Sequence, residues 1–317
     1  MKKVLITGSS LPFKEKEIEI LKDTAQVLVD DTWKKDVILK MIPEMDGLLV
    51  DVGADIDREI IERGQKLKII VEYGVGIDNI DIEAASEKGI YVCNLPHVFT
   101  VEVAEFAAGL ILTLSKHIIR QDSDIKRKGE WDSSLYSPLL LSGKTIGFVG
   151  YGRIARKLKE ILSGFSLRAI AYDPYLDHDM ISNEDIIKTG LEDLLKQSDI
   201  VSIHVPLNKE TRDLIDRDRL SLMKKNAILV NVSRGAIVNE DHLYDALRFG
   251  RISGAALDVL SAESSVKDNP LRKLDNIILT PHIAWKSEFS IENVEVQAAA
   301  KVRDFLKGKE VDGCVNL

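Results

Sequence analysis

Three polar residues in the second half of the chain, Arg234, Glu263 and His282, could together protonate and polarise a carbonyl group. Each follows a different apolar, strand-like segment, and the carboxyl ends of parallel strands meet at one edge of a sheet. A guanidinium offers a planar fork to a carboxylate, and a carboxylate beside an imidazole keeps the ring protonated near neutral pH. The pattern predicts that His282 donates a proton, that Glu263 maintains its charge and that Arg234 binds an anionic group.

Each of these residues alone also has an ordinary structural interpretation. His282 could cap the chain after Pro281, and Arg234 could form a surface ion pair. Asp258 ends the strand-like segment that precedes Glu263. The combination on three consecutive segments favours a functional site over unrelated surface residues.

A glycine-rich turn at 150–155, with the sequence Gly-Tyr-Gly-Arg-Ile-Ala, follows the apolar segment 145–149 and precedes a helical pattern. Gly150 permits a tight turn, and Gly152 lets the backbone approach a pyrophosphate at a helix N-terminus. Asp173 lies roughly 20 residues further on, where a carboxylate binds a ribose hydroxyl and repels a 2′-phosphate. The turn predicts NAD rather than NADP, although the same glycines could serve a tight turn alone.

The other histidines give weaker signals. His204 ends an apolar segment at the same expected edge, and it could line a nicotinamide site or simply pack. His97 precedes a long helical pattern and could face a cleft. No His or Cys cluster has the spacing of metal ligands, so we expect no metal. Histidines in polar or helical patterns are expected to be solvated: His117, His178 and His242.

Length and composition exclude several classes of protein. The chain has 317 residues, 45% hydrophobic and 30% charged, which is typical of two compact domains and not of a disordered chain. A formal net charge of −8 disfavours nucleic-acid binding. Cys93 and Cys314 lie far apart along the chain, so we expect neither a disulfide framework nor a four-thiolate metal site. Without a signal peptide or a membrane-spanning segment, the expected location is cytoplasmic.

Alternating strand-like and helical patterns predict two doubly wound parallel sheets. The tract 101–119 is expected to be one connector helix, 121–143 a surface excursion, and 287–306 a helix that docks on an existing surface. The expected strands are 4–7, 47–50, 68–71 and 91–94 in a first sheet, and 145–149, 168–172, 200–204, 227–231, 255–258 and 277–280 in a second.

Taken together, these motifs resemble those of the D-isomer-specific 2-hydroxyacid dehydrogenases, a family that includes phosphoglycerate, glyoxylate, glycerate and D-lactate dehydrogenases. The resemblance extends over nearly the whole chain. The matching segments are Tyr-Gly-Val-Gly-Ile-Asp-Asn-Ile-Asp at 73–81, Gly-Tyr-Gly-Arg-Ile at 150–154, His-Val-Pro-Leu at 204–207 with Glu-Thr-Arg at 210–212, Asn-Val-Ser-Arg-Gly at 231–235, Leu-Asp-Val at 257–259 with Glu263, and Pro-His-Ile-Ala at 281–284.

The resemblance implies a Rossmann NAD-binding domain, 99–285, inserted into a discontinuous flavodoxin-like substrate domain, 1–98 and 286–317. It implies a homodimer built around the connector helix, and a cleft that closes between the domains. Arg234, Glu263 and His282 would be catalytic, and the amides of Val75 and Gly76 would hold the substrate carboxylate with Arg234 and His282. The cofactor contacts would come from Gly150, Gly152, Arg153, Ile154, Asp173, Val205, Pro206, Thr211, Val232 and Asp258.

Departures from the family pattern bear on the substrate. Where phosphoglycerate-type members resemble Val-Arg-Ser, this chain has Val-Asp-Val at 50–52, and Asp51 would repel a phosphate. Phe99 and Glu102 replace a common Asn and Ser. A small or apolar 2-oxo acid such as glyoxylate or hydroxypyruvate is therefore favoured.

Two alternatives stay open. One is a D-3-phosphoglycerate dehydrogenase in which Lys34, Lys35 or Arg58 compensates for the missing arginine. The other, from a different class, is an NAD-sensing interaction protein similar to the corepressors of the family, which keep the same catalytic set.

Overall fold

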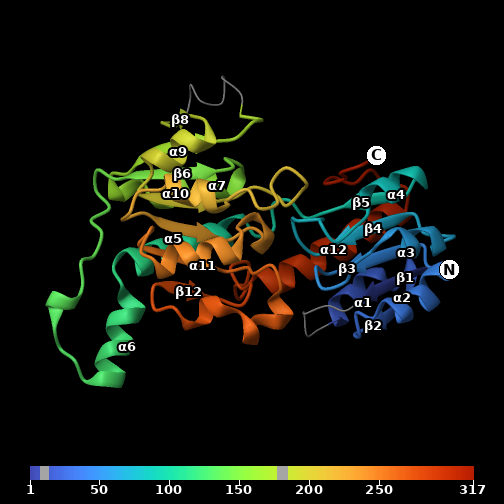
Figure 1. Cartoon of the computed structure of the whole chain (residues 1–317). Helices are drawn as coiled ribbons and strands as arrows, with labels where there is room; N and C mark the ends of the chain where they lie inside the picture. Colours follow the sequence, from blue (N-terminus) through green and yellow to red (C-terminus); the bar gives the residue numbers. More distant parts are fainter. Residues whose placement is uncertain (8–13, 177–184) are drawn as a thin grey trace. The chain divides into compact units, whose positions relative to one another are not determined.

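The computed structural model describes residues 1–7, 14–176 and 185–317. Its contacts divide the chain into two compact units (Figure 1). Unit 1 comprises Met1–Phe99 and Lys286–Leu317, and unit 2 comprises Thr100–Trp285. Unit 1 is therefore built from two stretches that lie far apart in the sequence.

Unit 1 contains a five-stranded parallel sheet in the order β2-β1-β3-β4-β5, which is the flavodoxin-like order. β2 was not among the expected strands. It lies at one edge and pairs with β1 alone, so most of its side chains are only half-buried or exposed and the apolar signal is weak. The bounds are β1 Lys2–Thr7, β2 Ala25–Asp30, β3 Gly47–Val50, β4 Ile69–Glu72 and β5 Tyr91–Cys93.

Helices cover both faces of this sheet. α2, α3 and α4 bury apolar side chains in one core cluster with the strands, and Asp57 and Asp81 cap α3 and α4 by accepting backbone N–H groups. On the other side α12 packs on α1, β3 and β4. A Cβ on Gly47 would lie 3.1 Å from Val302, so α12 approaches β3 closely there. The bounds are α1 Glu15–Leu21, α2 Lys35–Met41, α3 Arg58–Arg63, α4 Ile82–Glu87 and α12 Ser290–Leu306.

Unit 2 contains a seven-stranded parallel sheet in the order β12-β11-β10-β9-β6-β7-β8. This is the Rossmann order with one further strand beyond β11, so the expected fold class is confirmed. β8 was not expected because it has only two residues, both exposed. The bounds are β6 Thr145–Val149, β7 Arg168–Tyr172, β8 Ile187–Lys188, β9 Ile200–Ile203, β10 Ile228–Asn231, β11 Gly254–Leu257 and β12 Ile277–Leu279.

Two core clusters lie on opposite faces of the unit 2 sheet. α5 and α7 pack on one face, and α9 and α11 pack on the other (Figure 1). None of the helices in the described ranges is both long and apolar enough to cross a membrane. The bounds are α5 Thr100–Ser115, α6 Ile118–Lys128, α7 Arg153–Ile161, α9 Leu191–Gln197, α10 Arg217–Leu222 and α11 Glu240–Arg248.

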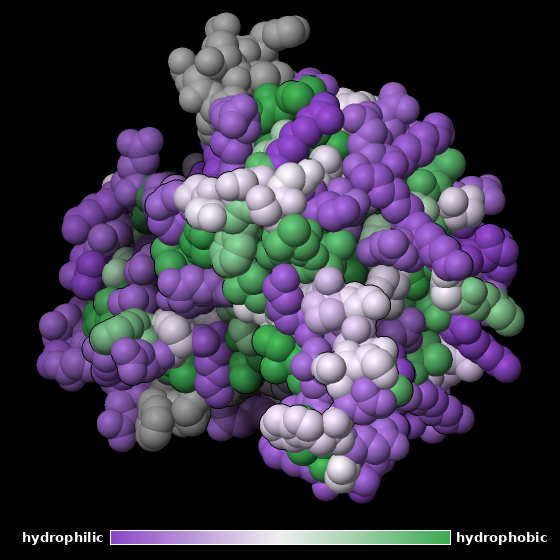
Figure 2. Space-filling view, turned by 90° about the vertical axis from the view of Figure 1, so that its left-hand side faces the viewer, coloured by the Kyte–Doolittle hydropathy of each residue, from purple (hydrophilic) through white to green (hydrophobic). Residues whose placement is uncertain are grey.

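The expected connector helix is in fact two helices. α5 ends at Ser115. His117 adopts a left-handed conformation with φ 56°, which interrupts the helix, and α6 begins at the next residue. α6 buries none of its residues, and it occupies the first part of the tract expected to be a surface excursion. Figure 2 looks onto the side of unit 2 that carries α6, where hydrophobic residues gather in patches.

Candidate functional site

The structure brings His282 and Glu263 together. Nδ1 of His282 lies 3.1 Å from Oε1 of Glu263, and their side chains are 27% and 48% exposed. Glu263 begins a 3₁₀-helix, Glu263–Asp268, after β11, and His282 follows β12. The pair therefore occupies the strand-end edge expected from the sequence, and the second ring nitrogen, Nε2, takes no part in it.

A turn held by Asp258 presents His282. The carboxylate of Asp258 is buried and accepts hydrogen bonds from the Thr280 hydroxyl at 2.6 Å and from the backbone N–H groups of Ile283 and Ala284 at 3.0 and 2.8 Å. His282 itself has φ 52°, a conformation that costs a non-glycine residue on the order of 1 kcal/mol. We infer that Asp258 positions His282; a contact between Asp258 and the cofactor stays a prediction.

Arg234 follows β10 on a turn that is also held by hydrogen bonds with a buried polar side chain. The buried Asn231 side chain donates to the Arg234 carbonyl at 2.9 Å and accepts from the Ser233 N–H at 3.0 Å. A Cβ on Gly235 would lie 2.0 Å from the Leu260 carbonyl carbon. Only glycine therefore allows the loop that leads to Glu263 to pass this close to the Arg234 turn. The need for glycine at 235 was not predicted.

The pKa of Glu263 depends on both His282 and Arg234. Partial burial opposes its ionisation, but the hydrogen bond and charge of His282, a backbone bond at Leu260 and the charge of Arg234 together lower the pKa of Glu263. Glu263 therefore stays ionised at neutral pH and holds its hydrogen bond to the His282 ring. Such an arrangement can donate a proton beside a guanidinium.

The glycine turn is shaped to receive a dinucleotide. Gly150 has φ 88°, and a Cβ there would lie 2.9 Å from the His204 backbone. A Cβ on Gly152 would meet nothing within 4 Å, and α7 begins after it without a side-chain cap. The first N–H groups of α7 thus point to space that a pyrophosphate could fill, so these residues fit the cofactor.

Asp173 lies beside the same turn. Its two carboxylate oxygens each accept a backbone N–H at 2.9 Å, from Tyr151 and from Tyr175. Each oxygen keeps a lone pair for a ribose hydroxyl. Asp173 therefore stabilises the turn, and its carboxylate can still accept a hydrogen bond from a ribose hydroxyl.

His204 packs beside Phe148, with ring centroids 6.1 Å apart, and its place at a nicotinamide site stays a prediction. Its Nε2 lies 2.8 Å from the hydroxyl of the buried Ser202, and burial lowers the pKa of His204 to about 3. The ring is neutral in the folded state. Of the solvated histidines expected from the sequence, His117 and His242 are half-buried, and His178 lies outside the described residues.

Other expected cofactor contacts lie on the loops after β9 and β10. The Thr211 hydroxyl donates to the Pro206 carbonyl at 2.6 Å and thereby closes the loop after β9. Val205 is buried, Val232 is half-buried, and Arg153 and Ile154 open α7. Their contact with a cofactor stays a prediction.

In unit 1 the loop with Val75 and Gly76 follows β4 and is partly exposed. The Asn94 amide donates to the Val75 carbonyl at 2.7 Å, and the Leu95 N–H donates to the Gly74 carbonyl at 2.8 Å. These bonds hold the loop against the chain that follows β5. The expected role of Val75 and Gly76 in binding a substrate carboxylate stays a prediction.

Unit 1 also buries several acidic side chains near this loop. The Tyr73 hydroxyl donates to Glu17 at 2.6 Å, and burial raises the pKa of Glu17. Burial, and then repulsion from Glu17, raises the pKa of Glu295 to about 7. The buried Asp51 lies within electrostatic reach of Tyr73. All three carboxyl groups therefore lie within electrostatic reach of Tyr73.

We expect the Glu295→Gln substitution to stabilise the protein at alkaline pH. The pKa of Glu295 is about 7 in the folded state and 4.5 for an unperturbed glutamate, the value expected in the unfolded chain. Between these two pH values the folded chain binds more protons than the unfolded chain, so the free energy of unfolding falls as pH rises from 4.5 to 7. Removing the charge should raise the free energy of unfolding by about 2 kcal/mol at pH 8 and by little at pH 4. Urea unfolding measures both.

Glu292→Gln is the matched control, because Glu292 lies on α12 and is exposed. It should change stability by less than about 0.5 kcal/mol at either pH. An equal effect of the two substitutions would contradict the explanation.

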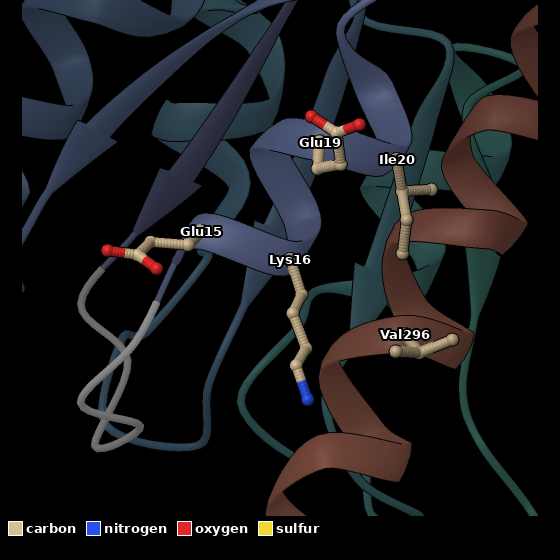
Figure 3. A pocket seen from close by; sticks show the side chains of 5 residues that line it. All are labelled: Glu15, Lys16, Glu19, Ile20 and Val296. Carbon is tan, nitrogen blue, oxygen red and sulfur yellow. The ribbon is translucent and has the colours of Figure 1, made fainter.

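A shallow hollow of about 520 Å³ lies between α1 and α12. Figure 3 shows Glu15 and Glu19 pointing away from Val296, which lines the opposite side. Lys16 in its wall forms an ion pair with Glu292 at 2.6 Å. The hollow contains none of the expected site residues.

Residues 108–284 match the NAD binding domain of the D-isomer specific 2-hydroxyacid dehydrogenases. A glyoxylate reductase of Thermofilum pendens is 40% identical over 95% of this chain and 91% of its own length. The chain belongs to the D-isomer specific 2-hydroxyacid dehydrogenase family. This confirms the resemblance and the NAD-binding character of unit 2.

Two other members of the family are similar over all or nearly all of the chain. A D-3-phosphoglycerate dehydrogenase of Methanocaldococcus jannaschii is 39% identical over 100% of this chain, which spans 60% of that relative. The crystal structure of a D-lactate dehydrogenase of Aquifex aeolicus, complexed with NAD and lactic acid, superposes with a TM-score of 0.89 at 31% identity and covers 96% of both chains. The dehydrogenase family thus includes relatives named for different substrates.

Proposed function

We propose that the protein reduces 2-oxo acids to D-2-hydroxy acids with NADH. The observation that carries this proposal is the contact between His282 and Glu263, with Arg234 on the neighbouring strand end, in the unit that matches an NAD binding domain. The relatives named above are all dehydrogenases or reductases, so nothing favours the interaction-protein alternative.

The chain's own residues would divide the work as follows. His282, oriented by its contact with Glu263, gives a proton to the 2-oxo oxygen, while Arg234 attracts electron density toward that oxygen and pairs with the substrate carboxylate. Asp258 holds the turn that aims His282. When bound, NADH supplies the hydride for the substrate carbon.

Oxidation of NADH, followed by absorbance with a panel of 2-oxo acids, tests the proposal. The panel contains glyoxylate, hydroxypyruvate, pyruvate, 3-phosphohydroxypyruvate and a branched 2-oxo acid. We expect turnover with at least one of them and a D-configured product. A protein that binds NADH and turns over none of them would contradict the proposal.

Within this panel we propose a preference for small substrates without a phosphate. The buried Asp51 would oppose a second anion. Two cations that could compensate are already paired: Lys35 lies 2.7 Å from Glu59, and Arg58 lies 2.6 Å from Glu87.

The alternative, a D-3-phosphoglycerate dehydrogenase, is favoured by the similarity to the Methanocaldococcus jannaschii relative. The ratio of kcat/KM for hydroxypyruvate and 3-phosphohydroxypyruvate distinguishes the two. A ratio above one supports the small substrate, and a ratio far below one supports the alternative.

We expect the Asp173→Ala substitution to shift cofactor preference toward NADP. Loss of the carboxylate removes both the ribose hydrogen bond and the repulsion of a 2′-phosphate, so the ratio of NADPH to NADH dissociation constants should fall by about tenfold or more. Fluorescence titration of both cofactors measures this ratio directly.

Asp173→Asn keeps one acceptor oxygen for the turn and should shift the preference in the same direction. Asp193→Ala, on the exposed surface of α9, is the matched control. Unchanged selectivity in both Asp173 variants would show that another group reads the ribose.

We also propose that the protein is a homodimer in the cytoplasm. α6 exposes Ile118, Ile119 and Ile125, and the segment after it exposes Trp131, Leu135 and Leu140. An exposed apolar surface of this kind is typical of an interface. Light scattering should report twice the chain mass, and Ile119→Glu should weaken the association.

A further inference from the structure

The two cysteines of the chain meet in unit 1. The Sγ atoms of Cys93 and Cys314 lie 2.6 Å apart, although 220 residues separate them and no sequence motif pairs them. Cys93 is the last residue of β5 and is buried, and Cys314 is half-exposed. Their distance along the chain therefore does not keep them apart in space.

Backbone hydrogen bonds align the pair. The Asn94 N–H donates to the Gly313 carbonyl at 3.0 Å, and the Val315 N–H donates to the Val92 carbonyl at 2.9 Å. These bonds flank an antiparallel bridge in which Cys93 and Cys314 face each other directly. Such a pair without mutual hydrogen bonds has Cα atoms about 4.5 Å apart, within the range that a disulfide spans.

We propose that Cys93 and Cys314 form a reversible disulfide that fixes the segment 312–316 on the edge strand β5. The segment is already docked without it. The Asn316 amide donates to the Ile90 carbonyl at 2.9 Å, and its oxygen accepts the Val92 N–H at 2.9 Å. Oxidation therefore needs little rearrangement of the backbone.

The residue next to Cys93 connects this bond to the loop proposed to bind the substrate. Asn94 holds the Val75 carbonyl through its amide, and its own carbonyl accepts Nζ of the buried Lys301 at 3.0 Å. Lys301 also donates to Asp312 at 2.6 and 2.7 Å. Fixing 312–316 would therefore restrict Asn94 and the loop; this consequence, unlike the disulfide itself, rests on the proposed function.

Gly313 shows how close the segment lies to Asn94. It has φ 68°, and a Cβ there would lie 2.6 Å from the Asn94 carbonyl oxygen. The segment can reach Cys93 only with glycine at this position. The order of residues 313–314, glycine and then cysteine, thus fits the pairing.

The chemistry assigns different roles to the two thiols. Burial raises the pKa of the Cys93 thiol, and the adjacent Cys314 adds to the effect, so the half-exposed Cys314 reacts first. Its thiolate attacks a small disulfide such as oxidised glutathione and releases one thiol. Cys93 then loses its proton and attacks the mixed disulfide, which releases the second thiol. The small disulfide gains the two electrons and two protons that the cysteines lose.

Thiol mapping tests the proposal. The protein is reduced, equilibrated with oxidised or reduced glutathione, denatured and alkylated, and its intact mass and peptides are measured. After oxidation we expect no alkylated cysteine and one peptide pair that joins Cys93 to Cys314, and reduction should restore both thiols. Two alkylated thiols, a stable glutathione adduct, or a bond between two chains would overturn the proposal.

Single substitutions separate the two roles. In Cys93→Ser, Cys314 should stop at the mixed disulfide because the second thiol is absent. In Cys314→Ser, the buried Cys93 should remain unmodified. Because Cys314 is half-exposed, its substitution keeps the fold, and rapid oxidation of Cys93 in that variant would contradict the assigned order.

Steady-state kinetics tests the connection to the loop. The oxidised protein should have a KM for the 2-oxo acid at least twofold different from that of the reduced protein, with kcat little changed, and Cys314→Ser should lose this redox dependence. Equal KM values would overturn the connection. A protein without turnover would contradict the proposed function, whereas the mapping would still decide the disulfide.

Discussion

Replacing His282 by Asn lowers kcat for 2-oxo acid reduction by about 10²-fold or more, because a positioned proton donor contributes roughly 10²- to 10⁴-fold. Asparagine can occupy the turn held by Asp258, but it cannot give up a proton at neutral pH. The ring lies outside the glycine turn proposed to hold the cofactor, so NADH binding should be kept. Stopped-flow measurement of NADH oxidation and fluorescence titration of NADH separate the two effects.

His242→Asn is the matched control in the same unit. Its Nδ1 accepts the Arg217 N–H at 3.1 Å, a contact that involves none of the three proposed catalytic residues, and its loss should leave kcat near normal. A near-normal rate in His282→Asn would remove His282 as the proton donor.

Replacing Arg234 by Gln should lower kcat/KM for the 2-oxo acid by about 10²- to 10³-fold, the loss typical when one group that stabilises developing negative charge is removed. Glutamine keeps hydrogen-bonding capacity but loses the charge and the planar fork. The charge of Arg234 also helps to keep Glu263 ionised, so the substitution weakens the support of His282 as well. Steady-state kinetics at saturating NADH measures the effect.

Two further variants show whether the activity depends on the planar, bidentate geometry of the guanidinium or on its charge alone. Arg234→Lys should recover part of the activity because it restores the charge alone. Arg217→Gln removes an exposed ion pair with Asp245 and should leave kcat/KM unchanged. If Arg234→Gln behaved like Arg217→Gln, Arg234 would not act on the substrate.

The sequence predicts those parts of the fold that are buried and periodic. The fully buried strands β3, β4, β6, β9 and β10 were expected because continuous apolar runs leave little choice between core and surface. β2 was not predicted because apolar and polar residues do not alternate regularly along this edge strand. The break at His117 was missed because a histidine gives no sign that it adopts a left-handed conformation.

The candidate site was predicted from residues that follow strands, because parallel topology brings strand ends to one edge. The supporting contacts were not predictable in the same way. The role of Asp258 depends on how the chain after β12 folds back, and the need for Gly235 depends on a loop 25 residues later. The meeting of Cys93 with Cys314 depends on the docking of two distant segments, which no local pattern records.

The most direct test of the central claim is a crystal structure of the protein with NADH and oxamate, an unreactive analogue of a 2-oxo acid. We expect Nε2 of His282 and the guanidinium of Arg234 each to lie within about 3.2 Å of an oxamate oxygen, beside the nicotinamide ring. A structure in which oxamate binds elsewhere, or in which either side chain points away from it, would contradict the account.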